Sequence, residues 1–113
     1  MSEIAQENRA PHIGQLPRTF SAPGVPVDQL DLAPLGGIPF SAAWFAVEPK
    51  CVSAPHEHHD RECWVVSSGR GFVEYEGRSV PLAPGDAVLL EPDRPHSARC
   101  DGDVPLVVFS IWW

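Results

Sequence analysis

Residues 55–62 read Pro55-His56-Glu57-His58-His59-Asp60-Arg61-Glu62, and this stretch carries most of the information about the chain. In an extended strand, side chains an even number of positions apart point to the same face. His56, His58 and Glu62 would therefore converge if the stretch were extended. Imidazole nitrogens and carboxylate oxygens bind zinc, iron, manganese, nickel or copper. The stretch predicts a mononuclear metal site, with His96 as a fourth candidate ligand.

Short runs of strand-forming residues surround this stretch and are separated by turn residues. We expect strands at residues 40–47, 63–66, 71–76, 79–82, 87–90, 96–100 and 104–113. Residues 87–90 are apolar at every position, which predicts a strand buried on both faces. Thirteen prolines in 113 residues disfavour helices, because a proline inside a helix costs about 3 kcal/mol. The pattern predicts an all-β sandwich or barrel with no helix longer than a turn.

The first 35 residues are predicted to form an extended arm. Six prolines lie within the first 40 residues, and proline fixes φ and removes a backbone donor. Apolar residues such as Ile13, Phe20 and Val25 lie among them, so we expect the arm to pack against the barrel or a neighbouring subunit. The predicted organisation is an arm at residues 1–35 and one barrel domain at residues 36–113.

The charge and cysteine content exclude several classes of partner. The formal net charge is −7 and the basic residues are scattered singly, whereas phosphate contacts need clustered Lys and Arg. The first residues have no apolar signal-peptide core, and residues 104–113 are too short to span a bilayer. Three cysteines without CxxC spacing are typical of free thiols. We expect a cytoplasmic protein that binds neither nucleic acid nor membrane.

Two separated motifs resemble those of the cupin family, whose members are small β-barrels of jelly-roll type. The first motif has the form HxH, three or four residues, Glu, six residues and Gly, and residues 56–69 match it throughout. The second motif has the form PGD, a short apolar strand and, further on, a histidine. Residues 84–96 match this spacing and end at His96. The resemblance covers residues 36–113 and implies a single-domain cupin barrel.

The chain departs from the family pattern at three positions. Lys50 stands where the first motif has a leading glycine, and Glu91 and Asp93 replace the proline and glycine that usually precede the last histidine. The replacements at Glu91 and Asp93 concern the conformation of the loop before His96, and not the ligand itself. A solvated polar loop would also explain the histidines of the first motif, but the second motif in the right order argues against it.

The resemblance implies that one divalent ion is held by four side chains, namely His56, His58, Glu62 and His96. Four protein ligands in an octahedral shell leave two positions open, which favours Fe, Mn, Ni or Co over structural zinc; Zn remains an alternative. An ion with open positions acts as a Lewis acid and, as Fe(II), also reacts with dioxygen. We therefore expect a metal-dependent enzyme for a small-molecule substrate, first of all an Fe(II) dioxygenase or oxygenase.

Three other functions stay open. The closest is a redox-neutral lyase, isomerase or cyclase that uses the metal as a Lewis acid. Another is a zinc cupin that joins amino acids through a nitrogen–nitrogen bond in specialised metabolism, because residues 62–71 and 110–113 resemble such cupin units. The last is a non-catalytic small-molecule-binding module, although such a module would not need vacant metal positions.

Aromatic residues near the motifs are candidates for a pocket wall, with core packing as the alternative for each. Trp64 lies two residues after Glu62 and should share its face. Trp44 and Tyr75 are further candidates, and a buried tyrosine hydroxyl needs a hydrogen-bond partner. His12 and His59 are not expected to be ligands.

Three further features lie near the second motif and the end of the chain. Cys100 shares a face with His96, so its thiol either approaches the cavity or is buried and inert. Arg94 either meets an anionic substrate or is a solvated loop charge. Large apolar residues on both faces of residues 104–113 indicate a surface covered by the arm or by a second subunit, and we expect a homodimer.

Overall fold

The computed structural model describes residues 13–113, so His12 lies outside the described residues. Its elements in chain order are β1 (Gly14–Gln15), β2 (Thr19–Ala22), β3 (Val25–Asp31), the short 3-10 helix η1 (Ala33–Leu35), β4 (Ser41–Val47), β5 (Glu62–Ser68), β6 (Gly71–Tyr75), β7 (Arg78–Leu82), β8 (Ala87–Leu90), β9 (His96–Cys100) and β10 (Leu106–Trp112). From β4 onward the strand positions agree closely with those expected, because alternation of apolar residues and Gly or Pro turns specify them locally.

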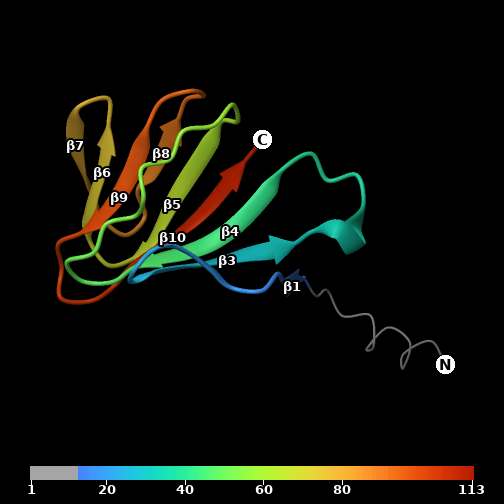
Figure 1. Ribbon diagram of the computed structural model, residues 1–113, viewed down its shortest axis with the longest axis horizontal. Coiled ribbons are helices and arrows are strands. Elements are labelled where there is room, and N and C mark those ends of the chain that lie inside the picture. Colours follow the sequence, from blue (N-terminus) through green and yellow to red (C-terminus); the bar gives the residue numbers. More distant parts are fainter. Residues whose placement is uncertain (1–12) are drawn as a thin grey trace.

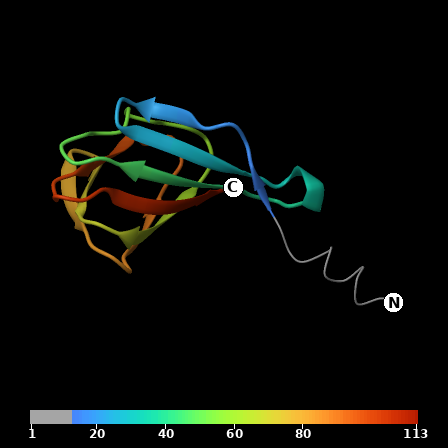
Figure 2. The same ribbon diagram turned by 90° about the horizontal axis from the view of Figure 1, so that it is seen from below.

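The strands form two antiparallel sheets that make one barrel (Figures 1 and 2). The large sheet has the order β1-β3-β4-β10-β5-β8, with β2 paired to β3, and the small sheet has the order β7-β6-β9. The β3–η1–β4 segment extends away from the rest of the barrel (Figure 1). The prediction of a small all-β barrel of jelly-roll type is confirmed.

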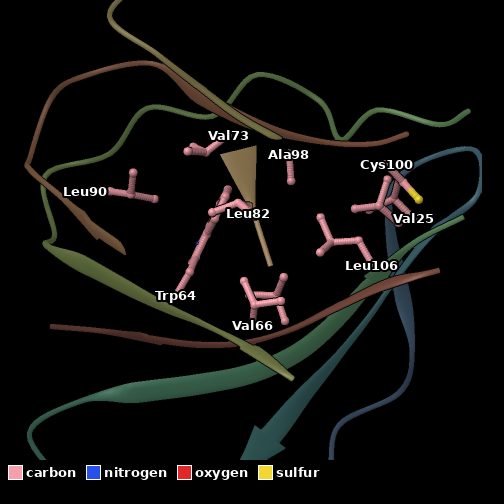
Figure 3. Close-up of a cluster of buried hydrophobic side chains, with 11 residues drawn as sticks. Val25, Trp64, Val66, Val73, Leu82, Leu90, Ala98, Cys100 and Leu106 are labelled. Carbon is pink, nitrogen blue, oxygen red and sulfur yellow. The ribbon is translucent and has the colours of Figure 1, made fainter. Parts of the chain in front are cut away.

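The barrel interior is filled by alternate side chains of each strand. In β5, Trp64 and Val66 are buried whereas Val65 between them is exposed, and in β10 Leu106 and Val108 are fully buried. Figure 3 shows the buried cluster between the sheets, with Leu90 at one end, Val25 and Cys100 at the other, and Trp64, Val66 and Leu106 between them. Burial of each such side chain stabilises the fold by about 1.5–3 kcal/mol.

Gly69 explains why the first motif ends in glycine. It follows β5 with a φ of +79°, a conformation that side chains with a Cβ rarely adopt. A Cβ at this position would lie 2.1 Å from the carbonyl oxygen of Pro105, a backbone atom that cannot rotate away. The chain therefore needs glycine here to bring the end of β5 against the start of β10.

One condition for the convergence of His56, His58 and Glu62 on one strand face is not met, and one local prediction was wrong. Residues 54–61 do not form a strand, because Pro55 lacks a donor and the chain bends at residues 59 and 60; the strand begins only at Glu62. The strand β8 is buried on one face alone: Leu90 is fully buried but Leu89 is 53% exposed. The reason is that β8 is the last strand in the sheet order and nothing among the described residues covers its outer face.

The described part of the predicted arm forms strands of the large sheet. β3 pairs with β4 through Val27, Asp28 and Gln29, and Val25 is fully buried in the core. Ser21 in β2 accepts a hydrogen bond from the backbone N–H of Ala54 at 3.0 Å. Residues 19–31 therefore contribute both to the core and to the position of the loop that carries the first motif.

The outer face of the large sheet is apolar. Trp44 on β4 and Phe109 on β10 are paired across the strands, with ring centroids 4.8 Å apart, and Val65 and Leu89 are exposed on the neighbouring strands. The homodimer expected from the sequence stays a prediction. In the described part of the chain, no helix has the length and apolar character needed to cross a bilayer.

Candidate metal centre

Four side chains from three segments meet at one end of the barrel. His56 and His58 come from the loop before β5, Glu62 is the first residue of β5, and His96 is the first residue of β9. One ligand atom from each residue lies within 4.8 Å of the others. Glu62 and His96 are buried, His58 is half-buried and His56 is exposed. The four residues named from the sequence are thus brought together as a candidate metal site.

Backbone hydrogen bonds position the loop that carries the first two histidines. The N–H groups of His56 and His96 each donate to the other residue's carbonyl oxygen at 2.9 Å, which places these two ligands side by side. The N–H of Asp93 donates to the carbonyl of His58 at 2.7 Å, and Arg61 exchanges two such bonds with Trp113. The loop has little regular secondary structure, yet it is tied to the barrel at every ligand.

Both carboxylate oxygens of Glu62 are occupied, and by different kinds of partner. Oε1 lies 3.0 Å from Nε2 of His58 and 3.0 Å from Nε2 of His96. Oε2 accepts a hydrogen bond of 2.7 Å from the indole N–H of Trp64 and a short one from the hydroxyl of Ser110. With Oε2 held by two donors, Oε1 is the oxygen that is directed at the imidazoles. Trp64 and Ser110 therefore orient the carboxylate.

The spacing at Oε1 fits a divalent ion. Nδ1 of His96 lies 3.1 Å from the carbonyl oxygen of Arg94, which can only accept, so the ring proton is assigned to Nδ1 and Nε2 presents a lone pair to Glu62. Two lone pairs at 3.0 Å need a cation or a proton between them. Two ligands about 2.1 Å from one ion and at right angles to each other are about 3.0 Å apart. The residues present thus suit a metal.

His96 is oriented more firmly than His58. A metal-binding histidine usually donates its second ring N–H to an outer partner, and the Arg94 carbonyl has that role for His96. Among residues 13–113, the buried Nδ1 of His58 has no hydrogen-bond partner. The ring of His58 is held instead by packing against its neighbours, with centroids 4.8 Å from His56 and 5.5 Å from His96.

The electrostatics of the site favour the ionisation states that bind metal. Burial raises the pKa of Glu62. In the metal-free site, where a proton takes the place of the ion between Oε1 and the imidazoles, hydrogen bonds from His96, Ser110, Trp64 and His58 outweigh burial and lower the pKa to about 2. Burial lowers the pKa of His56, and the neighbouring imidazoles lower it further. At neutral pH the carboxylate is therefore ionised and His56 is neutral, as metal ligation requires.

A cavity of about 510 Å³ opens beside the four side chains. All four candidate ligands line it. The rest of its wall is mostly apolar and aromatic, with a few polar side chains, and consists of Val25, Val27, Ala43, Phe45, Ala54, Pro55, Trp64, Trp112, Ser21, Ser53, Asp60 and Ser110. The site is thus a mostly apolar pocket with a small number of polar groups, which is the usual form of a small-molecule site.

The three aromatic pocket candidates lie in three different places. Trp64 lines the cavity, and its ring packs edge-on against His96 with centroids 5.6 Å apart. Trp44 is not part of the cavity lining, because it is on the outer face of β4 and is 38% exposed. Tyr75 lies beside His96 on the neighbouring strand, outside the cavity, and its hydroxyl accepts a hydrogen bond from the N–H of Glu91 at 3.2 Å.

The remaining candidates near the second motif do not reach the cavity. Cys100 is buried in the core, with its thiol 3.2 Å from the carbonyl of Val104. Arg94 forms an ion pair with Glu76. His59, which was not expected to be a ligand, is exposed and lies 2.7 Å from Asp93.

Sequence reasoning missed Ser110, Trp112 and Asp60. Ser110 is a polar residue among apolar ones in the last strand, and its even spacing from Leu106 and Val108 places it on the inner face. That signal was available, since a buried hydroxyl needs a partner. Its contact with Glu62 depends on how β10 pairs with β5, and no local pattern specifies that register.

Comparison with known proteins gives a consistent family and fold. The family described as Cupin domain matches residues 43–112. A Cupin 2 conserved barrel domain protein from Salinispora arenicola CNS-205 is 27% identical, with a TM-score of 0.79 over 92% of this chain and 89% of that chain. A cupin 2 domain-containing protein from Halorhodospira halophila is also 27% identical, with a TM-score of 0.72 over 83% and 67%. KdgF from Halomonas sp. is 23% identical, with a TM-score of 0.69 over 86% of each chain, a likeness of fold alone.

Proposed function

Because the chain belongs to the family of cupin domains, we propose that it is a metal-dependent enzyme that converts a small molecule in the cavity beside His56, His58, Glu62 and His96. One observation carries the proposal: three imidazoles and one carboxylate converge in the wall of a cavity of about 510 Å³. A divalent ion bound there would supply Lewis acidity and, as Fe(II), reactivity toward dioxygen.

The chain's own residues would prepare the site before substrate binds. Trp64 and Ser110 hold one oxygen of Glu62, so the carboxylate does not have to reorganise when a ligand arrives. The apolar walls from β3 and β4 exclude water from the substrate body, which strengthens polar interactions inside the cavity.

Among the reactions open to such a site, we propose an Fe(II)-dependent oxygenation first. The four-ligand set supports it, since it leaves two positions of an octahedral shell for substrate and dioxygen. A redox-neutral Lewis-acid reaction, as a lyase, isomerase or cyclase, uses the same ligands and is the alternative that the test below separates.

The test starts from protein purified without oxygen and loaded with one equivalent of Fe(II) or Zn(II). Metal content, dioxygen uptake and product formation would be measured over a panel of small apolar and aromatic compounds. We expect uptake of dioxygen coupled to product with Fe(II) and none with Zn(II). Turnover with Zn(II) in the absence of dioxygen would contradict the proposed oxygenation and support the redox-neutral Lewis-acid reaction. Failure to retain either ion would contradict the proposal as a whole.

A further inference from the structure

The charges around the cavity narrow the substrate class. Among residues 13–113, the cavity lining contains no lysine or arginine. It does contain the carboxylate of Asp60, in addition to the candidate ligand Glu62. Asp60 is exposed and also lines the cavity, so it lies at the rim of the cavity.

The arginines nearest in sequence are already occupied by carboxylates. Arg61, between Asp60 and Glu62, is directed to Glu91, with Nε 3.1 Å from Oε1. Arg94, which the sequence offered as a possible receptor for an anionic substrate, pairs with Glu76. Neither guanidinium lines the cavity. A carboxylate or phosphate on the part of a substrate remote from the metal would therefore meet no cationic side chain there.

The cavity wall also favours a particular substrate body. Phe45, Trp64 and Trp112 present aromatic surface to the cavity, with the rings of Phe45 and Trp64 5.3 Å apart and edge-on. Aromatic faces attract cations and apolar groups and have no attraction for anions. The net charge of −7 adds a field of the same sign.

We infer that the substrate binds the metal through one end and carries an aromatic or apolar body with a positively charged group, such as an ammonium, that is bound by Asp60. Asp60 is then the residue that determines specificity for charge. This inference rests on the proposed metal-dependent function, since the metal holds the other end of the molecule. It excludes substrates with a second anionic group, because that group would face Asp60 and the aromatic wall without compensation.

The experiment uses the full chain loaded with Zn(II) and three probes that share one metal-binding end. These are benzohydroxamates with an aminomethyl, hydroxymethyl or carboxylate group in the para position. Affinities are measured by calorimetry and by quenching of tryptophan fluorescence, since Trp64 and Trp112 line the cavity. We expect the aminomethyl probe to bind at least about 10-fold more tightly than the carboxylate probe, with the hydroxymethyl probe between them.

Two variants separate the role of Asp60 from that of overall charge. Asp60→Asn should weaken binding of the aminomethyl probe and strengthen binding of the carboxylate probe. The ratio of the two affinities, called the affinity gap below, should therefore fall at least about threefold. Asp103→Asn is the control, because it changes the net charge by the same amount at an exposed turn that does not line the cavity. It should leave the affinity gap between the two probes unchanged. Zinc content is measured for each protein.

The outcomes distinguish this inference from the proposed function. Tighter binding of the carboxylate probe, or an unchanged gap in Asp60→Asn, with zinc retained, overturns the assigned charge preference and leaves the metal enzyme intact. If Asp103→Asn also lost the preference for the aminomethyl probe over the carboxylate probe, the preference would be due to net charge, and the role of Asp60 would be overturned. Failure of the wild-type chain to retain zinc would overturn the proposed function first.

Discussion

The barrel interior has an open end, at Glu62, His96 and Ser110, and a closed end, at Val66, Cys100 and Leu106, and the same three strands build both. The closed end is apolar, and Leu106 and Val66 have at most 2% of their surface exposed. The open end contains a buried carboxylate that has partners at both oxygens. A strand can thus change from core to binding site within four residues.

The two ends of the barrel contribute to different properties, the closed end to folding stability and the open end to metal binding. At the closed end, side-chain burial and close backbone contact hold the sheets together, so substitutions there should affect folding and leave the ligand geometry of the folded protein unchanged. At the open end, a buried charge is tolerated only because hydrogen bonds replace water around it. Substitutions there should therefore affect metal binding more than folding.

The largest effect is expected at Gly69, near the closed end. Gly69→Ala should destabilise the protein by more than about 4 kcal/mol, because a Cβ would both strain the backbone and collide with the Pro105 carbonyl. Gly77→Ala is the matched control: its φ is +75°, yet no atom lies within 4 Å of the added Cβ, so only the backbone strain remains. Denaturant unfolding measures both, and equal losses would show that the close approach has no role.

The next effect is expected at the carboxylate of the open end. Glu62→Gln should lower metal affinity by more than about 100-fold, beyond the loss that follows removal of an outer hydrogen-bond partner. Glu91→Gln is the control, because Glu91 is an exposed carboxylate outside the cavity lining. It should leave the metal affinity unchanged. Competition with a chelator measures both affinities. Comparable affinity in Glu62→Gln and wild type would remove Glu62 from the ligand set.

Acid should destabilise the metal-free protein through the open end. Glu62 has a pKa near 2 in the folded protein against 4.5 for an unperturbed glutamate, so its contribution is complete above pH 4.5 and is lost as the pH falls toward 2. The loss amounts to about 3 kcal/mol. His56 has a lowered pKa, so its smaller contribution is present above pH 6.5 and is lost below it. Denaturant unfolding measured between pH 2 and 8 tests this. In Glu62→Gln the free energy of unfolding should depend less on pH between about pH 2 and 4.5.

The smallest effect is expected from the two donors to Oε2 of Glu62. Trp64→Phe and Ser110→Ala should each lower metal affinity by about 10- to 100-fold, because the carboxylate loses an orienting hydrogen bond. Trp44→Phe is the control, since Trp44 lies on the outer face of the same sheet. The same chelator competition measures these affinities. If Trp64→Phe and Ser110→Ala both kept wild-type metal affinity, the two hydrogen bonds to Oε2 would have no influence on metal binding.

Much of this could be predicted from the sequence, for a local reason. The strand bounds follow from alternation and turn residues, and β8 and β9 begin and end where the sequence predicted. The four candidate ligands follow from two motifs whose spacing is independent of the loops between them. Residues 54–61 do not form the extended strand on which the spacing argument depended, yet the ligands still converge, because backbone pairing of His56 with His96 brings them together.

The sequence by itself determined the all-β barrel and the identity of the four side chains at its open end, since these depend on residue type and on spacing along the chain. The tertiary structure alone decided that Trp44 faces outward rather than into the cavity, and that Ser110 reaches Glu62. Those contacts depend on the register between strands far apart in the sequence. A shift of one residue in that register would reverse the face of every side chain.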